Sequence, residues 1–487
     1  AVTMLGVPAE MYRYGIQYWA CSISGLIVTI FMVYVFLPVF FELQTTSCYA
    51  YLEQRFSRRV RTLASFLYVL YCLLNVPVLI YTPAIAFSQV TGIKLHIITP
   101  IICCICIFYT TFGGIRAVIW TDTLQFGSMI VALCVVMTIG TLQMGGIINI
   151  FELADAGGRL IWFNMDPDPS LRSSFWLVSL GLTSMWVSNI GVTPECVQRF
   201  LTVPDLSSAK KAVWIFGVGH IIVKLCSVYN GLLIFSKYHD CDPVHSGLVQ
   251  KNDQIFPYFV LEVAQKIPGL PGMFVVGFFS AALSSMSTLM NTLSGTIYDD
   301  FVKPHFSFSE RTASNVIKTM VVTIGVICLL LVFVVEKLGS VFSLAISVSG
   351  VTSGTLLGIF FLGMFSPYIN AKGAFWGAII SLGSMCFIAA GAQLEILDGN
   401  LKYPSLPLHY DGCDGFNSTG TIIAVLAGTV ISYATGGQQK PISDRLLTPW
   451  VRSWYKSVRS VDDYEYKQPP QQMQVLLGVK DPAKIHK

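Results

Sequence analysis

Charged side chains are scarce in this chain of 487 residues. Asp, Glu, Lys and Arg together make up 12% of it, whereas hydrophobic residues make up 54%. A soluble domain carries about a quarter charged residues, so the scarcity excludes the series of soluble domains that the length alone would suggest. The net charge of +4 is also too small to indicate a nucleic-acid-binding protein. The composition predicts a polytopic helical membrane protein.

Catalytic and nucleotide-binding motifs are absent as well. The sequence has no GxxxxGK phosphate loop, so nothing in it indicates ATP as an energy source. It has no HExxH and no GxSxG motif, and its ionisable residues do not cluster near one membrane face. We therefore expect no enzyme, no resident cofactor and no metal other than a transported ion.

Long apolar runs are what the sequence has instead. A helix needs about 20 apolar residues to cross a bilayer. The first ten residues are apolar but shorter than this and lack the charged start of a signal peptide, so we interpret Ala1–Glu10 as the second half of a helix whose start is missing from this chain. Eleven predicted spans follow: Tyr18–Phe41, Leu63–Phe87, Ile97–Phe112, Leu124–Leu142, Phe175–Val192, Val213–Phe235, Met273–Tyr298, Val316–Val335, Val341–Gly363, Ala374–Gly391 and Thr421–Ala434.

The placement of Lys and Arg sets the expected orientation. Four arginines between positions 55 and 61 follow the first span, and cytoplasmic loops carry an excess of basic residues. Alternation then predicts a cytoplasmic C-terminus, with residues 1–436 as the transmembrane domain and the polar segment 437–487 as a disordered tail. The sequon at Asn417 falls in a predicted outer loop, where it could be glycosylated. Cys241 and Cys413 are also predicted outside, either paired or free.

Hydroxyl side chains cluster in the Met273–Tyr298 span. Ser280, Ser284, Thr288 and Asn291 recur at spacings of four and three, so they share one helix face. Small hydroxyl residues commonly pack membrane helices together. The clustering here is denser than packing requires, and neutral oxygens suit a dehydrated Na+. Both interpretations stay open on this pattern.

The sequence Gly6-Val7-Pro8 predicts a break in the first helix. Pro removes a backbone donor and Gly tolerates unusual dihedrals, so carbonyls near Met4 and Val7 would lose their helical partners. Discontinuous helices of this kind form the midplane ion sites of secondary transporters. The alternative is a simple kink or a loop at the mouth of the protein.

Two further groups of ionisable residues suggest function. Lys224 lies inside a predicted span with His220 one turn earlier, and an intramembrane cation is a functional candidate that would attract an anion. The alternatives are snorkelling to the interface or a bond to a carbonyl. Asp122 lies at the cytoplasmic mouth of the Leu124–Leu142 span, either as an exit ligand for a cation or as an ordinary acid at a helix start.

Several segments, in this order, resemble the sodium:solute symporter family. They are LGVPAEMYRYG, YLEQRFSRRVR, FYTTFGGIRAVIWTDTLQ, FNMDPDPSLRSSFW, VQRF, KIPGLPGMF and SAALSSMSTLMN. The similarity is greatest to the branch that carries iodide, monocarboxylates and vitamins. It implies an all-α, LeuT-like inverted repeat of five plus five helices in the plasma membrane, with extra C-terminal helices. It also implies that one helix and the inner half of the broken helix are absent at the N-terminus.

The resemblance also implies a set of site residues. Na+ would bind carbonyls of the broken helix and oxygens of the eighth core helix, and Asp122 matches the acid on the exit path. Thr3, Thr193, His220 and Lys224 are the candidate substrate residues. The sodium positions are Met4, Val7, Ala281, Ser284 and Ser285.

The expected function is sodium-coupled symport of a small organic anion, such as biotin, pantothenate or a monocarboxylate. Na+ would bind first and raise the affinity for the substrate, which is a coupling between two sites. A carrier of an inorganic anion such as iodide is the alternative. So is a channel or sensor on the same scaffold, because a fold does not determine a function.

Overall fold

The computed structural model describes residues 2–43, 47–166, 174–249, 254–264, 269–335, 341–397, 413–439 and 441–457. Within these ranges the side chains are described except at positions 2, 89–90, 112–122, 264, 270, 334–335, 341–349, 392–397 and 413–416. The described residues contain helices and no strands, which confirms the all-α prediction.

The helices follow the predicted spans closely. The main elements are α1 (Val2–Tyr14), η1 (Ile16–Ala20), α2 (Cys21–Phe31), η2 (Met32–Phe36), α3 (Leu37–Leu43), α4 (Ala50–Arg55), α5 (Arg58–Thr91), α6 (Leu95–Gln143), α7 (Ile147–Ala156), η3 (Leu177–Gly181), α8 (Leu182–Gly191), α9 (Pro194–Leu201), α10 (Leu206–Lys237), α11 (Ile255–Ala264), α12 (Leu270–Ile297), η5 (Tyr298–Val302), α13 (Glu310–Val335), α14 (Val341–Phe365), α15 (Ala371–Leu397), α16 (Cys413–Ala434) and η6 (Asp444–Leu446). Within the described residues, eight helices are long and apolar enough to cross a membrane.

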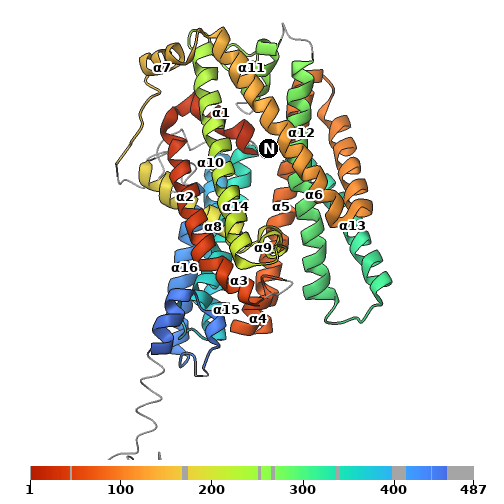
Figure 1. Ribbon diagram of the computed structural model, residues 1–487, viewed down its shortest axis with the longest axis vertical. Coiled ribbons are helices and arrows are strands. Elements are labelled where there is room, and N and C mark those ends of the chain that lie inside the picture. Colours follow the sequence, from red (N-terminus) through yellow and green to blue (C-terminus); the bar gives the residue numbers. More distant parts are fainter. Residues whose placement is uncertain are drawn as a thin grey trace, which may run out of the picture.

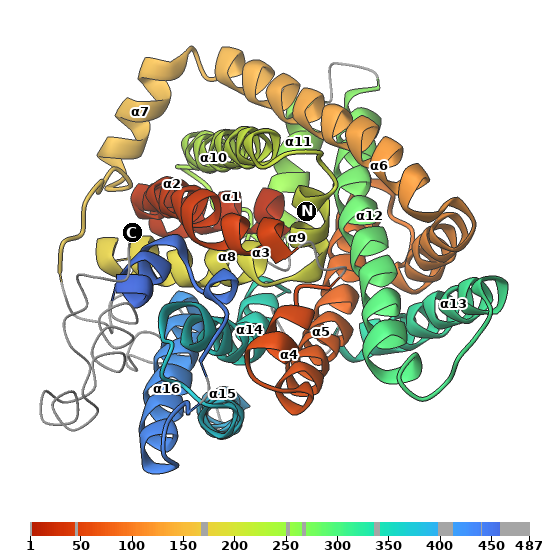
Figure 2. The same ribbon diagram turned by 60° about the horizontal axis from the view of Figure 1, so that its bottom comes forward.

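Helix α1 lies near the centre of the bundle in both overall views (Figures 1 and 2). It packs mainly on α10, with further contacts to α11 and α14. A Cβ on Gly231 of α10 would stand 2.9 Å from the carbonyl oxygen of Pro8 and would collide with Met11. A glycine at this position therefore lets the two helices approach closely, which fixes the depth of α1 in the molecule.

The predicted break at Gly6-Val7-Pro8 is wrong, because α1 is helical from Val2 to Tyr14 with Pro8 inside it. Neighbouring helices can support a proline within a membrane helix, and the packing of α1 on Gly231 provides such support. One consequence of the prediction survives. Pro8 has no N–H, so the carbonyl of Met4, four residues earlier, has no helical donor at that position.

Helix α6 covers two of the predicted spans. It contains the apolar segments 95–111 and 123–143 in a single helix of 49 residues, whereas a cytoplasmic loop was predicted between them. At 1.5 Å per residue such a helix is about 70 Å long, more than twice the apolar thickness of a bilayer. Figure 1 draws it as two arms that meet at one end, so each arm corresponds to one predicted span.

Glycines join the last three spanning helices. A Cβ on Gly377 of α15 would stand 2.6 Å from both the nitrogen and Cα of Gly428 on α16. On α14, Gly354 and Gly358 approach backbone oxygens of Asn417 and Thr421 in the same way. Small residues spaced by four allow membrane helices to pack backbone against backbone, so this interface depends on the absence of side chains.

We therefore expect Gly377→Leu to disrupt the contact between α15 and α16. The backbone of Gly428 cannot move aside as a flexible side chain could, so the variant should lower the thermal unfolding midpoint of the purified protein by several degrees. Gly383→Leu is the matched control, because a Cβ at Gly383 on the same helix would meet no atom of another described element within 4 Å. Equal midpoints for the two variants would contradict this account of the interface.

Part of the predicted disordered tail is folded. Residues 441–457 are described, and Leu447 is fully buried. The segment is held by Tyr51 Oη, which donates to the Leu446 carbonyl at 3.0 Å, and by Arg452, whose Nη2 lies 2.7 Å from a carboxylate oxygen of Glu42. The prediction of disorder from position 437 is therefore wrong for 441–457, while residues 458–487 lie outside the described part of the chain.

Candidate functional site

The hydroxyl face of α12 is largely inside the protein. Ser287 is fully buried, and Ser284, Ser285 and Thr288 are partly buried. The hydroxyl of Ser285 donates to the Ala281 carbonyl at 3.1 Å, and that of Ser287 donates to the Ser284 carbonyl at the same distance. These hydroxyl groups can rotate, and their oxygens can accept a cation while the hydrogen stays bonded to the carbonyl. The face can therefore supply ligands to a small cation without carrying a charge itself.

Helix α1 supplies the other predicted half of this site. Met4 and Val7 are 2% and 1% exposed, and they belong to one buried apolar cluster with Phe274 and Phe278 of α12. Ala281 packs against the edge of the same cluster. Residues of α10 and α11 belong to the same cluster, and α1 packs on these two helices, so α1 and α12 are linked through a shared core. Thr3 is half-buried in the first turn of α1.

Lys224 points into the protein rather than toward lipid. It is 1% exposed, and its Nζ lies 4.3 Å from the centre of the Trp186 ring on α8. The ring of His220 meets the same indole edge to face, with the ring centres 4.5 Å apart. A cation over an aromatic face is stabilised by the ring quadrupole. The snorkelling interpretation of Lys224 is therefore wrong.

Trp186 is the member of this group that sequence reasoning missed. It lies between Ser184 and Ser188 in a predicted span, and only its contacts with Lys224 and His220 of α10 reveal its role. Trp186 and His220 also line a small pocket between α2, α8 and α10. The buried Nε2 of His220 has no hydrogen-bond partner among the described residues. Thr29 also lines the pocket, so a polar group entering it would find hydrogen-bonding groups on Thr29, Trp186 and His220.

The other predicted substrate residue has a local role. The hydroxyl of Thr193 donates to the Asn189 carbonyl at 2.5 Å, and Thr193 is the residue before the first turn of α9. Its hydroxyl is thus engaged in the turn between α8 and α9. Asp122 lies in α6, but its side chain is outside the described residues, as is that of Cys413. The predicted exit ligand and the possible Cys241–Cys413 disulfide stay predictions.

The expected glycosylation site needs correction. Asn417 lies inside α16 rather than in a loop, and it is fully buried. Its amide nitrogen donates to Ser353 Oγ of α14 at 2.7 Å. A glycan is attached to that same nitrogen, so it would require the end of α16 to separate from α14. The loop position predicted for this sequon is therefore wrong.

Polar contacts join the opposite end of α12 to its neighbours. Arg61 Nε donates to Asp300 Oδ1 at 2.8 Å and Arg61 Nη1 to Glu53 at 2.7 Å, while Ser65 also donates to Asp300. Two contacts come from α9: Tyr68 Oη donates to Glu195 Oε2 at 2.7 Å, and Arg199 Nη2 donates to Thr288 Oγ1 at 2.7 Å. Burial raises the pKa of Glu195, although the Tyr68 bond acts in the opposite direction.

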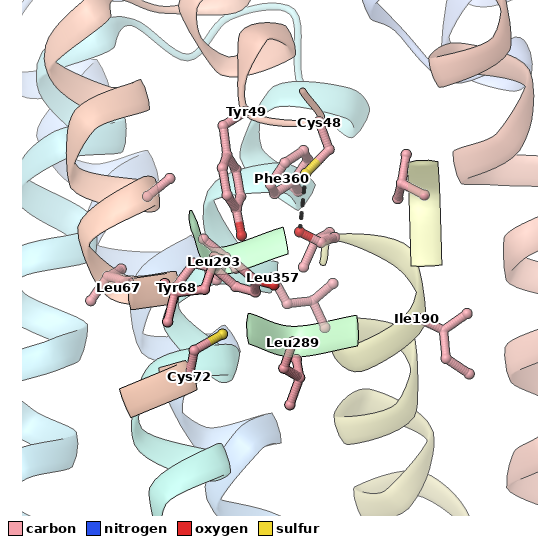
Figure 3. Packing of buried hydrophobic residues seen from close by; sticks show 14 of the residues in the cluster. Cys48, Tyr49, Leu67, Tyr68, Cys72, Ile190, Leu289, Leu293, Leu357 and Phe360 are labelled. Atoms are coloured by element: carbon pink, nitrogen blue, oxygen red, sulfur yellow. Dashed lines mark hydrogen bonds between the residues drawn. The ribbon is translucent and has the colours of Figure 1, made fainter. Parts of the chain in front are cut away.

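An apolar cluster fills the space between these polar contacts. Tyr68, Leu289, Leu357 and Phe360 come from α5, α12 and α14 and are almost fully buried. Figure 3 shows them packed together, with the Cys48 thiol donating to the Val192 carbonyl at 3.6 Å beside them. Charged residues lie around this cluster and not in it, so this end of the bundle is sealed by packing. Among the described residues, no three His, Cys, Asp or Glu side chains form a metal-binding group.

Comparisons with known proteins agree with this architecture. The model of the "Sodium:solute symporter family" matches residues 1–381. Sodium-coupled monocarboxylate transporter 1 of Homo sapiens is 37% identical over 456 residues, which cover 93% of this chain and 74% of the relative. The sodium/iodide cotransporter of Homo sapiens is 36% identical over 81% of this chain and 62% of its own length.

Solved structures share the fold. A Na+-coupled sialic acid symporter in a substrate-bound outward-open state superposes with a TM-score of 0.73 at 22% identity, covering 90% of this chain and 88% of that one. A transporter of the nucleobase-cation-symport-1 family gives a TM-score of 0.52 at 14% identity, with 89% and 90% coverage. These similarities support the predicted helix arrangement, while the sequence relatives above carry the assignment to a family.

Proposed function

Since this chain belongs to the sodium:solute symporter family and is a sodium-coupled solute symporter, we propose that its solute is a small organic anion, in particular a short monocarboxylate. The observation that carries this proposal is Lys224, a cation 1% exposed inside a spanning helix. An ionisable residue inside a membrane span is a candidate for a functional site. Relatives at 37% identity are named as monocarboxylate transporters, which supports the same class of substrate.

Sodium binding is proposed between α1 and α12, which contribute to one buried apolar cluster. The Met4 and Val7 carbonyls, together with the carbonyl of Ala281 and the hydroxyls of Ser284 and Ser285, form a set of neutral oxygens. Such a set carries no negative charge to balance the ion. The bound Na+ therefore adds a positive charge to the interior, which favours the binding of an anion nearby. This is how ion and substrate would raise each other's affinity.

Transport then follows by alternating access. Na+ binds first and fixes α1 against α12, and the anion binds near Lys224 and Trp186. The bundle moves and releases both to the other side. The sodium gradient supplies the energy together with the membrane potential, at about 2.3 kcal/mol per charge per 100 mV. We further propose a plasma-membrane location with the C-terminus in the cytoplasm, on the positive-inside pattern.

Uptake into proteoliposomes tests the substrate class. Purified protein is reconstituted, and labelled lactate, biotin, pantothenate and iodide are offered with an inward gradient of Na+ or of choline. We expect lactate to be concentrated inside the proteoliposomes with the Na+ gradient and not with the choline gradient. Uptake that is equal in choline would contradict sodium coupling. Concentration of iodide but not of lactate would favour the inorganic-anion alternative, and passive equilibration would indicate a channel.

Lys224→Met tests the role of the buried cation. Removing a charged hydrogen-bond partner costs about 1.5–3 kcal/mol, so the half-saturating lactate concentration should rise by at least about tenfold. Lys237→Met is the matched control, because Lys237 lies at the end of the same helix and pairs with Glu262 at 3.1 Å on the surface. Equal effects of the two variants would remove Lys224 from the site.

A further inference from the structure

The short helix α9 carries two polar side chains on one face. Glu195 and Arg199 are four residues apart, which places them on neighbouring turns. Val197 and Phe200 are buried on the other side and hold α9 in the apolar core. Packing therefore sets the orientation of α9 in this closed form, and its polar face is turned toward α5 and α12.

Each of the two polar side chains reaches a different helix. Glu195 accepts from Tyr68 of α5, and Arg199 donates to Thr288 of α12, both at 2.7 Å. Thr288 is one turn beyond Ser284, on the same face of α12. Any cation that leaves the proposed sodium site along this face toward the α12 terminus meets Thr288 next, and it finds that hydroxyl already bound by a guanidinium group.

We propose that Arg199 and Thr288 form the gate at the exit of the sodium path, with the Glu195–Tyr68 bond holding α9 in place. This inference rests on the proposed sodium site. While the contact is closed, the positive charge of Arg199 opposes the passage of Na+. Its guanidinium group also occupies the Thr288 hydroxyl, which would otherwise be the next oxygen ligand of the ion. When α9 moves away from α12, the hydroxyl and the path are freed together, so release of the ion is tied to the movement of the helix.

The contact should also set the balance between closed and open forms. Loss of a hydrogen bond to a charged group at a partly exposed position shifts such a balance by about fivefold. Thr288→Val and Arg199→Gln should each open the gate to this extent. Thr288→Ser keeps the hydroxyl and should behave like the native chain. The double variant should be no worse than Arg199→Gln alone, because Thr288→Val removes only the contact that Arg199→Gln has already removed.

Cys196 provides a direct readout of the gate. It is partly buried in α9 between the two polar side chains, so movement of α9 should expose its thiol. Inside-out vesicles without Na+ are treated with a membrane-impermeant maleimide, and modification of the Cys196 peptide is followed by mass spectrometry. We expect about fivefold faster modification in Thr288→Val and Arg199→Gln. Thr138→Val is the control, since the Thr138 hydroxyl is exposed and donates to the Cys134 carbonyl of its own helix.

Sodium efflux, measured in a second batch of inside-out vesicles that is loaded with Na+, completes the test. Faster Cys196 modification with faster efflux supports the gate. An unchanged modification rate in both variants, or additive effects in the double variant, overturns it. Faster modification with unchanged efflux also overturns it, because α9 would then move without controlling the ion. The Cys196 measurement needs neither Na+ nor transport, so a failure of the proposed sodium site is seen separately in variants of Ser284 and Ser285.

Discussion

Replacing Ser284 and Ser285 together by alanine is expected to raise the Na+ concentration for half-maximal uptake by more than about tenfold. Each hydroxyl that binds a charged group contributes about 1.5–3 kcal/mol. The change removes only two oxygen atoms from a partly buried helix face, so α12 should keep its packing. Uptake rates measured over a range of Na+ concentrations, at a fixed substrate concentration and with surface abundance determined in parallel, give the result.

Ser294→Ala is the control for this experiment. Ser294 lies on the same helix and is fully buried, but its hydroxyl donates to the Met290 carbonyl at 2.7 Å, well beyond the proposed site. It should leave the sodium dependence unchanged. Substrate affinity at saturating Na+ should also be nearly native in the double variant. Unchanged activation by Na+ in Ser284→Ala/Ser285→Ala would refute the proposed sodium site.

Most of the spans could be predicted from the sequence, because a helix that crosses a bilayer needs about 20 predominantly apolar residues. The hydroxyl face of α12 was visible for a similar reason, since spacings of four and three stand out against an apolar background. What could not be predicted were the partners of each face. Trp186 has an ordinary place in α8, and its contact with Lys224 depends on α8 and α10 both packing on α2.

The wrong predictions share one physical cause. Local signals at Pro8, at Asn417 and at the start of the tail were each overridden by tertiary contacts. Pro8 stays helical where α1 meets Gly231, Asn417 is held by Ser353, and the 441–457 segment is anchored at Leu447. Sequon and disorder patterns describe a chain in water, whereas these residues lie against the ends of packed helices.

The Arg61–Asp300 pair should have the largest effect on stability. Its Asp300 side chain is 1% exposed, and Arg61 donates to it with Nε and Nη2. Arg61→Met would leave a buried carboxylate with only the Ser65 hydroxyl as a donor among these contacts. An uncompensated buried charge costs about 3–5 kcal/mol. Because Arg61 itself is 21% exposed, water would compensate part of this, and we expect about 3 kcal/mol.

Thermal unfolding of the purified protein measures this loss of stability, and we expect the unfolding midpoint of Arg61→Met to be lower by several degrees. The double variant Arg61→Met/Asp300→Leu should recover part of it, because an apolar pair of similar size can replace a buried ion pair at little cost. Arg59→Met is the control, since Arg59 is exposed two residues away on the same helix. If Arg61→Met were no worse than Arg59→Met, or if the double variant were worse than Arg61→Met alone, the pair would not hold α5 to the end of α12. Any fall in the unfolding midpoint of Arg61→Met would then have to arise within α5 itself.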